Sequence, residues 1–204
     1  MEYKKRSVFR EYLLTFAIAV LIALFVRTFV VQAFKIPSGS MRETLLVGDH
    51  ILVNKFIYGV KLPVVRKTII PVGEPERGDV IVFIYPEDRN KDFIKRVIAV
   101  AGDRVEIRNK NIFVNGVIHT DGHGIYEDDI TYPRSVQPRD NFGPVVVPEK
   151  HVFTMGDNRD HSYDSRYWGF VDLDDVLGKA FLIYWSWDRD KHRVRWNRIG
   201  TVLK

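Results

Sequence analysis

The chain has 204 residues, of which 46% are hydrophobic and 28% are charged, and its formal net charge is +5. This length and composition predict one folded domain with room for a small appendage, and they exclude a largely disordered chain. Because there is no cysteine, disulfides, thiolate metal sites and a cysteine nucleophile are excluded as well. The basic residues gather near both ends of the chain, a distribution that favours anionic lipid headgroups over nucleic acid.

The first predicted element is an apolar helix near the N-terminus. Tyr12–Val26 contains no charge, and a helix of this length spans about 22 Å, so flanking residues are needed to cross a hydrocarbon core of roughly 30 Å. A soluble domain can bury such a helix, and a cleaved secretory signal ends at a small-x-small site. No such site follows here, because Arg27 leads into Thr28–Phe34, which has the pattern of a strand. The sequence therefore favours an uncleaved transmembrane anchor, which comprises residues 9–27.

Basic residues on the two sides of this anchor predict its orientation. More of them precede the apolar run than follow it closely, namely Lys4, Lys5, Arg6 and Arg10 against Arg27 and Lys35. An excess of positive charge marks the cytoplasmic side of a membrane segment. Residues 1–8 are thus predicted to be cytoplasmic, and residues 28–204 are predicted to lie on the outer side of the cell (inner or plasma) membrane.

The remainder of the chain has the pattern of a β domain. Short runs rich in Val, Ile, Phe and Tyr alternate with turn residues, and the predicted strands are His50–Phe56, Asp79–Tyr85, Phe93–Val100, Arg104–Arg108, Asn111–Val114, Val145–Val147, Val152–Thr154 and Lys179–Trp185. Asn115-Gly116 predicts a two-residue hairpin turn. Residues 119–144, rich in polar residues, Gly and Pro, predict a long excursion loop. The predicted fold class is mainly β, an antiparallel barrel or paired sheets with one N-terminal transmembrane helix.

The first segment that can carry chemistry is IPSGSMRETL, residues 36–45. Ser40 follows a glycine at the end of a predicted strand, so its hydroxyl can project from a turn. The Ser38 hydroxyl and the Ser40 N–H can face the same small volume, as a nucleophile with an oxyanion hole requires. By itself the segment also fits an ordinary turn.

The second such segment is FIKRVIAVAGD, residues 93–103, in which Lys95 begins an apolar strand. Such a lysine is either a solvated strand end or a buried amine whose pKa is lowered by desolvation and by the adjacent Arg96 charge. A lysine with the ordinary pKa of about 10.4 is under about 1% neutral at pH 8, so only the buried alternative supplies a general base.

The third segment is MGDNRDHSYDSRYWG, residues 155–169, a dense polar run bounded by glycines. Gly156 allows the backbone to approach a crowded centre. Ser162 is short enough to hydrogen-bond a neutral lysine amine and fix its direction. Asp164 and Arg166 can pair and lock the turn.

PSGSMRETL, RGDVIVFIYP, KRVIAVAGD and GDNRDHSYDSRYWG occur in this order, and together they closely resemble the boxes of the bacterial type I signal peptidases. The likeness extends from about residue 9 to 185. It implies a largely β catalytic domain on the outer face of the membrane, bound to lipid and acting on secretory pre-proteins. Sites of the Ala-x-Ala type are implied, and neither metal nor other cofactor is expected.

The resemblance also implies a role for individual residues. Ser40 attacks the scissile carbonyl, Lys95 is its general base, and Ser38 donates to the oxyanion. Ser162 orients Lys95, while Gly156, Asp164 and Arg166 support the third box. Five apolar residues beside the boxes would form shallow pockets that admit small side chains, namely Phe34, Ile36, Leu45, Val82 and Ile94. Any second domain that larger members insert between Asp103 and Gly156 must be reduced here to the 119–144 loop.

Four alternatives remain open at this stage. A Ser–His–Asp hydrolase would use His161 with Asp157, Asp160 or Asp164. The same four residues would have to supply a metal site, although their spacing fits neither an EF-hand nor a zincin. A membrane-tethered β module that only binds a partner has the same patterning. The self-cleaving SOS-type repressors share Ser–Lys chemistry, but no helix-turn-helix pattern precedes Ser40.

Overall fold

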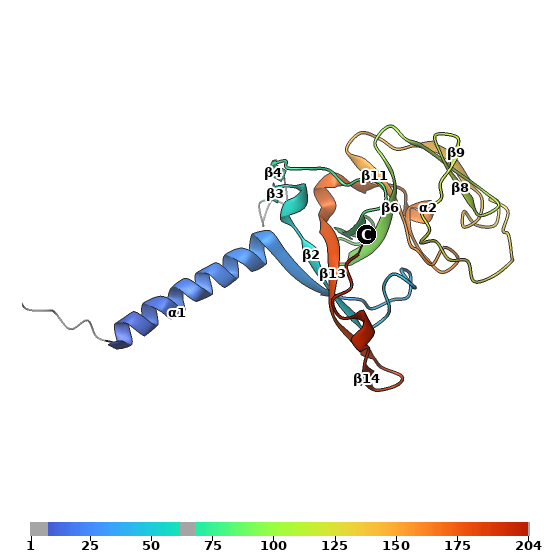
Figure 1. Ribbon diagram of the computed structural model, residues 1–204. Helices are drawn as coiled ribbons and strands as arrows, with labels where there is room; N and C mark the ends of the chain where they lie inside the picture. Colours follow the sequence, from blue (N-terminus) through green and yellow to red (C-terminus); the bar gives the residue numbers. More distant parts are fainter. Residues whose placement is uncertain (1–7, 62–67, 204) are drawn as a thin grey trace, which may run out of the picture.

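The computed structural model describes residues 8–61 and 68–203 and consists of one projecting helix and a β body (Figure 1). Helix α1 (Val8–Phe25) buries none of its residues and is followed by a π-helical turn, Val26–Val30. Val8–Thr28 is long and apolar enough to cross a membrane. All side chains of α1 are exposed, so no face of this apolar helix is buried against the β body. Residues 1–7, on which most of the predicted cytoplasmic segment falls, lie outside the described residues.

The larger sheet of the described chain runs antiparallel throughout, and the three candidate catalytic segments lie in its strands or directly beside them. Its strand order is β1 (Val31–Lys35), β2 (Asp49–Asn54), β13 (Val176–Asp188), β5 (Val80–Ile84), β6 (Asp92–Val100), β11 (His151–Met155) and β12 (Val171–Asp172), with β14 (Arg193–Val194) paired to β13. Because β5 lies between β13 and β6 with all its residues buried, it reads as a continuous apolar run.

A second sheet and a short hairpin complete the β structure of the described residues. The second sheet has the order β10 (Phe142–Val146), β7 (Arg104–Arg108), β8 (Asn111–Val114) and β9 (Val117–Ile118), and the hairpin pairs β3 (Val60–Lys61) with β4 (Thr68–Ile70). In Figure 1, β8 and β9 lie at the end of the body away from α1. Among residues 31–61 and 68–203, the helical structure consists of α2 (Ser165–Trp168) and single 3₁₀ turns at Phe56–Tyr58, Leu173–Asp175 and Trp196–Arg198.

Three apolar clusters form the core and follow from the alternation in the strands. Strand β2 alternates buried and half-buried residues, as a strand with one covered face does. One cluster joins Ile36, Met41 and Leu45 to β2, β5 and β13, and a second joins β6 and β11 to the second sheet. Met41 and Leu45 are fully buried, and each such side chain contributes about 1.5–3 kcal/mol. The segment that carries Ser40 is therefore fixed to the core.

The predicted fold class, mainly antiparallel β with one N-terminal helix, is confirmed, and so is the turn at Asn115-Gly116. Both turn residues have positive φ, 55° and 80°, and they join β8 to β9. Other boundaries were wrong. The strand expected from Thr28 begins at Val31, where pairing with Asn54 of β2 starts, and helical turns continue up to that point. Strand β10 begins at Phe142, three residues earlier than expected, because it pairs with Ile107 of β7.

The 119–144 loop is held against the third box along much of its length. Ile125 N donates to Asp157 O at 2.8 Å, and Arg159 N donates to Ile125 O at 2.9 Å. Lys110 and Arg139 form ion pairs with Asp128 at 3.1 and 2.8 Å. This excursion is therefore a packed part of the domain, and its last three residues belong to β10.

Candidate active site

Ser40 and Lys95 come from separate parts of the chain and meet in the larger sheet. Ser40 lies in the turn between β1 and β2, whereas Lys95 lies on β6. Lys95 Nζ is hydrogen-bonded to Ser40 Oγ at 2.8 Å and to the Ile94 carbonyl oxygen at 3.0 Å. An amine at this distance from a hydroxyl is within reach of its proton.

Backbone hydrogen bonds hold the Ser40 turn on both sides. Within the turn, Arg42 N donates to Gly39 O at 3.0 Å and Leu45 N donates to Met41 O at 2.7 Å. From the third box, Asn158 N donates to Ser40 O at 3.1 Å. This last contact could not be predicted from the sequence, because it depends on which loops meet in three dimensions. The Ser40 hydroxyl is thus presented by a fixed backbone.

Lys95 is buried, with 4% of its surface exposed. It lies opposite Ile81 of β5, and its amine is 5.3 Å from the centre of the Phe93 ring. Burial lowers the pKa of Lys95 to about 8, while Asp164 and Asp157 act in the opposite direction and Arg166 adds to the lowering. Because desolvation penalises the charged form of an amine, a large neutral fraction is present near pH 8.

Arg96, which we expected to lower the pKa of Lys95, points to the other side of β6. It is completely buried and forms a bidentate pair with Asp157, Nε–Oδ1 2.9 Å and Nη2–Oδ2 2.8 Å. Its Nη1 donates to Gly78 O, and the hydroxyl of Thr44 donates to Asp157. The Arg96 charge is therefore compensated, and the expectation was wrong because adjacent strand residues face opposite ways. The pair instead ties β6, the Ser40 turn and the third box together.

Asp164 and Arg166 lock the third box from inside. Asp164 caps α2, and both its oxygens accept from Arg166, Nε–Oδ1 2.8 Å and Nη2–Oδ2 2.8 Å. Arg166 also donates to the carbonyl oxygens of Arg139 and Arg159 at 2.7 Å. Burial opposes the charge of Asp164, but Arg166 outweighs it and keeps the pKa of that carboxyl below its ordinary value. The pair is charged and fully hydrogen-bonded.

Gly156 and Ser162 lie next to the Ser40 turn. A Cβ added to Gly156 would overlap both the Ser162 hydroxyl and the Ser40 carbonyl oxygen, so only glycine allows this approach. The Ser162 hydroxyl is buried and has no hydrogen-bond partner within residues 8–61 and 68–203, although it is near enough to Asp164 to help lower the pKa of that carboxyl. The expected bond between Ser162 and Lys95 is not formed in this structure.

The Ser38 hydroxyl and the Ser40 N–H are two donors, from residues that line one cavity, without an acceptor among the described residues. Ser38 is exposed and faces the same cavity as Ser40. Neither its hydroxyl nor the Ser40 N–H has a hydrogen-bond partner in the part of the chain that the structure describes. Free donors next to a nucleophile are what a developing oxyanion needs.

The five apolar residues expected to form substrate pockets belong to one cluster. Ile36, Leu45 and Val82 are buried in it, while Phe34 and Ile94 are partly buried and pack against it. A separate cavity of about 440 Å³ contains Ser40 and Lys95 and none of these five. Its other principal lining residues are Ser38, Arg42, Phe93, Asn158, His161 and Tyr163. The dyad therefore lies between an apolar cluster and a mixed polar cavity.

The residues required by a Ser–His–Asp hydrolase are not brought together. His161 is 59% exposed, and its Nε2 lies 3.2 Å from Glu127 Oε2. Asp157 and Asp164 are paired with arginines, and Asp160 is paired with Lys110 at 3.0 Å. Among the described residues, no group of three or more His, Asp or Glu could hold a metal ion.

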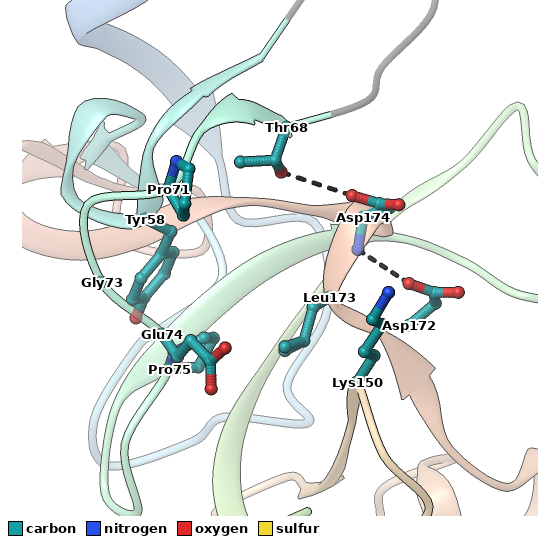
Figure 2. A pocket seen from close by; sticks show the side chains of 10 residues that line it. All are labelled: Tyr58, Thr68, Pro71, Gly73, Glu74, Pro75, Lys150, Asp172, Leu173 and Asp174. Carbon is teal, nitrogen blue, oxygen red and sulfur yellow. Dashed lines mark hydrogen bonds between the residues drawn. The ribbon is translucent and has the colours of Figure 1, made fainter.

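Another cavity, of about 300 Å³, shares no lining residue with this site (Figure 2). Its polar groups serve the local fold: Thr68 Oγ1 donates to Asp174 Oδ1 at 3.3 Å, and Asp174 N donates to Asp172 Oδ1 at 2.8 Å. The Tyr58 hydroxyl donates to Asp79. Since none of its lining residues forms a nucleophile–base pair, it offers no chemistry comparable with the Ser40–Lys95 pair.

Comparison with known proteins gives consistent matches. A family model described as "Signal peptidase, peptidase S26" matches residues 9–185. Signal peptidase I of Pseudomonas fluorescens is 40% identical over 97% of this chain and 81% of its own length, and that of Pseudomonas aeruginosa is 38% identical over the same shares. A crystal structure of a signal peptidase I from Enterococcus faecalis is 30% identical, covers 52% of this chain and 97% of its own, and has a TM-score of 0.41.

Proposed function

Because the chain belongs to the signal peptidase family, peptidase S26, and is thus a serine endopeptidase that removes signal peptides from pre-proteins, we propose that it cleaves with Ser40 as nucleophile and Lys95 as general base. The observation that carries this proposal is the 2.8 Å contact between Lys95 Nζ and Ser40 Oγ. Burial of the amine, with a pKa of about 8, supports it because the base must be uncharged to accept a proton.

The proposed reaction has two stages. As Ser40 Oγ attacks the scissile carbonyl carbon, its proton moves to Lys95, and the new oxyanion accepts hydrogen bonds from the Ser38 hydroxyl and the Ser40 N–H. The C–N bond then breaks, and the Lys95 ammonium gives its proton to the leaving amine of the mature protein. In the second stage Lys95 takes a proton from water, which attacks the ester carbon. The bond from this carbon to Ser40 Oγ then breaks, Lys95 returns the proton to Oγ, and the signal peptide leaves with a free carboxylate.

We propose that small residues before the cut are selected by the apolar cluster of Phe34, Ile36, Leu45, Val82 and Ile94. Ile36, Leu45 and Val82 are packed in the core, so the exposed part of the surface comes from Phe34 and Ile94 and is small. A shallow apolar surface has room for Ala at the positions of an Ala-x-Ala site, and a larger side chain would have to displace core residues.

The exposed apolar helix α1 supports anchoring in the cell (inner or plasma) membrane. We propose a single span with the N-terminus in the cytoplasm and the β body on the outer side, in contact with membrane lipid. The excess of basic residues before the helix supports this orientation.

The test is cleavage of a pre-protein with an Ala-x-Ala site by the purified full chain in detergent. Ser40→Ala and Lys95→Ala should each fall below about one thousandth of the wild-type rate. Cleavage by either variant at the wild-type rate would reject the assignment. EDTA should leave the wild-type rate intact, since no step uses a metal.

His161→Ala separates this mechanism from a Ser–His–Asp alternative. We expect its rate to stay within about tenfold of wild type, because His161 is exposed and pairs with Glu127. Removal of a general base would lower the cleavage rate on the order of 10²- to 10⁴-fold. If His161→Ala lost activity in the upper part of that range while Lys95→Ala remained active, His161 rather than Lys95 would be the general base.

A further inference from the structure

The cavity of about 440 Å³ beside Ser40 and Lys95 is lined by none of the five apolar residues that we propose select small residues before the cut. On the basis of the proposed function, we propose that this cavity receives the first residues of the mature protein, directly after the cut, and that Arg42 makes it favour acidic side chains there. The residues that line the cavity and the charge of that lining both support this assignment.

The position of Lys95 indicates which part of the substrate passes this cavity. In the proposed reaction the amine returns its proton to the new N-terminus of the mature protein. The residues after the cut must therefore leave along a surface that includes Lys95. The cavity contains both Ser40 and Lys95, whereas the five apolar residues assigned to the other side of the cut are absent from it.

The charge of the lining favours an acidic ligand. Its basic residues are Arg42, Lys95 and His161, and no Asp or Glu among the described residues lines it. The side chain of Arg42 is 54% exposed. Its Nη1 donates to Glu127 Oε1 and its Nε lies 4.0 Å from Glu43 Oε1, while its Nη2 has no acceptor in the described ranges. A guanidinium with a free donor binds a carboxylate in a defined direction and repels a lysine.

The 119–144 loop holds the Arg42 guanidinium in place through Glu127. The Glu127 carboxylate lies between Arg42 Nη1 and His161 Nε2, while its backbone N donates to Asp160 Oδ2 at 2.8 Å. Asp160 is itself buried and paired with Lys110 at 3.0 Å. The backbone of Glu127 is thus held by the buried Asp160, and Glu127 does not line the cavity. This arrangement gives the excursion loop a function, which is to position a cation beside the leaving side of the cut.

The experiment uses the full chain in detergent and a set of pre-proteins that share one Ala-x-Ala site. Each carries Glu, Gln or Lys at the first or second position after the cut. For wild type we expect kcat/KM to be about three- to tenfold higher with Glu than with Lys at one of these positions, as for a partly exposed ion pair. Salt of about 0.5 M should reduce the ratio, since it screens exposed charges.

Substitutions at Arg42 identify the source of the preference. Arg42→Gln should bring the Glu-to-Lys ratio close to one, and Arg42→Lys should retain part of it. Arg89→Gln is the matched control, because Arg89 is also exposed and paired, with Asp175, and does not line the cavity; it should keep the wild-type ratio.

Two outcomes overturn the inference, and they differ from a failure of the proposed function. Equal rates for Glu and Lys in the wild type would overturn it, and so would an unchanged ratio in a folded Arg42→Gln protein. In both cases Ser40-dependent cleavage persists and the catalytic assignment stands. Cleavage that does not depend on Ser40 would reject the proposed function itself.

Discussion

Lys95 and Arg96 are neighbours on β6, and both are buried basic residues, yet their hydrogen-bond partners differ. Arg96 faces Asp157 and forms two hydrogen bonds with its carboxylate. Lys95 contacts a hydroxyl, a carbonyl oxygen and the face of the Phe93 ring, and its hydrogen bonds include no carboxylate. A buried cation with a counterion stays charged, whereas one without a counterion in contact loses part of its affinity for protons. One side of the strand thus provides structure and the other provides a base.

Of the two residues, Lys95 is the one whose burial lowers the stability of the folded protein. Burial lowers the pKa of Lys95 from 10.5 to about 8, which corresponds to about 3 kcal/mol of lost stability. Between these two pH values the unfolded chain holds more protons than the folded one, so stability rises with pH across this window. Below pH 8 the full penalty is present.

Lys95→Met gives the largest effect and tests both statements at once. We expect the cleavage rate to fall on the order of 10³- to 10⁴-fold. At pH 7 the free energy of unfolding should rise by up to about 3 kcal/mol, because the desolvated charge is removed while the volume is kept. Guanidinium unfolding in detergent, followed by tryptophan fluorescence, measures this. A variant that is both inactive and clearly less stable would show that Lys95 is a structural cation like Arg96.

Asp157→Asn should produce the opposite result on the other side of β6. Leaving the buried Arg96 charge without its partner costs about 3–5 kcal/mol, and the link from Asp157 to Thr44 in the Ser40 turn is weakened as well. We expect lower stability and lower activity together, measured by the same unfolding and cleavage assays. Stability within about 1 kcal/mol of wild type would mean that the pair is not the structural link between the three segments.

The strands and the turn at Asn115-Gly116 could be predicted from the sequence because alternation and turn chemistry are local. The start of β1 could not, since the β-branched and aromatic residues around Val26–Val31 suit both a helix in lipid and a strand. Only pairing with β2 fixes the boundary. The candidate catalytic residues came from four motifs taken together, because a separation of 55 residues between Ser40 and Lys95 does not specify which strands are neighbours. For the same reason the Arg96–Asp157 pair and the Arg42–Glu127 contact were not predicted.

The pH dependence of kcat/KM measures the free Lys95 amine directly. Only the uncharged form accepts the Ser40 proton, so kcat/KM should rise about tenfold per pH unit below about pH 8 and level off above it. Because the amine is half protonated at pH 8, the decrease from pH 8 to pH 6 is about fiftyfold. Asp157 raises the pKa of Lys95, so Asp157→Asn should move the midpoint to lower pH. A midpoint above pH 10 in wild type would mean that the amine is not desolvated.

Ser162→Ala should have a smaller effect, because we propose that this residue only directs the amine. Its hydroxyl is buried and unpaired among the described residues, so it is free to bond the Lys95 amine during the reaction. Loss of that bond should lower kcat about tenfold, as for one hydrogen bond to a buried reacting group, while KM stays the same. If kcat does not change, Ser162 has no part in orienting the base.

Arg89→Gln should have the smallest effect. It tests whether burial is the reason why the Arg96–Asp157 pair contributes more to stability than an exposed pair does. Arg89 forms the same bidentate contact with Asp175, at 2.8 and 2.6 Å, that Arg96 forms with Asp157, but its side chain is 57% exposed. Water solvates the guanidinium whether or not it is paired, so the substitution should cost less than about 1 kcal/mol. The cleavage rate should remain that of wild type, because Arg89 does not line the cavity beside the dyad. If Arg89→Gln destabilised the protein as much as Asp157→Asn, the contact geometry rather than burial would determine the strength of these pairs, and the contrast between Arg96 and Lys95 would need another cause.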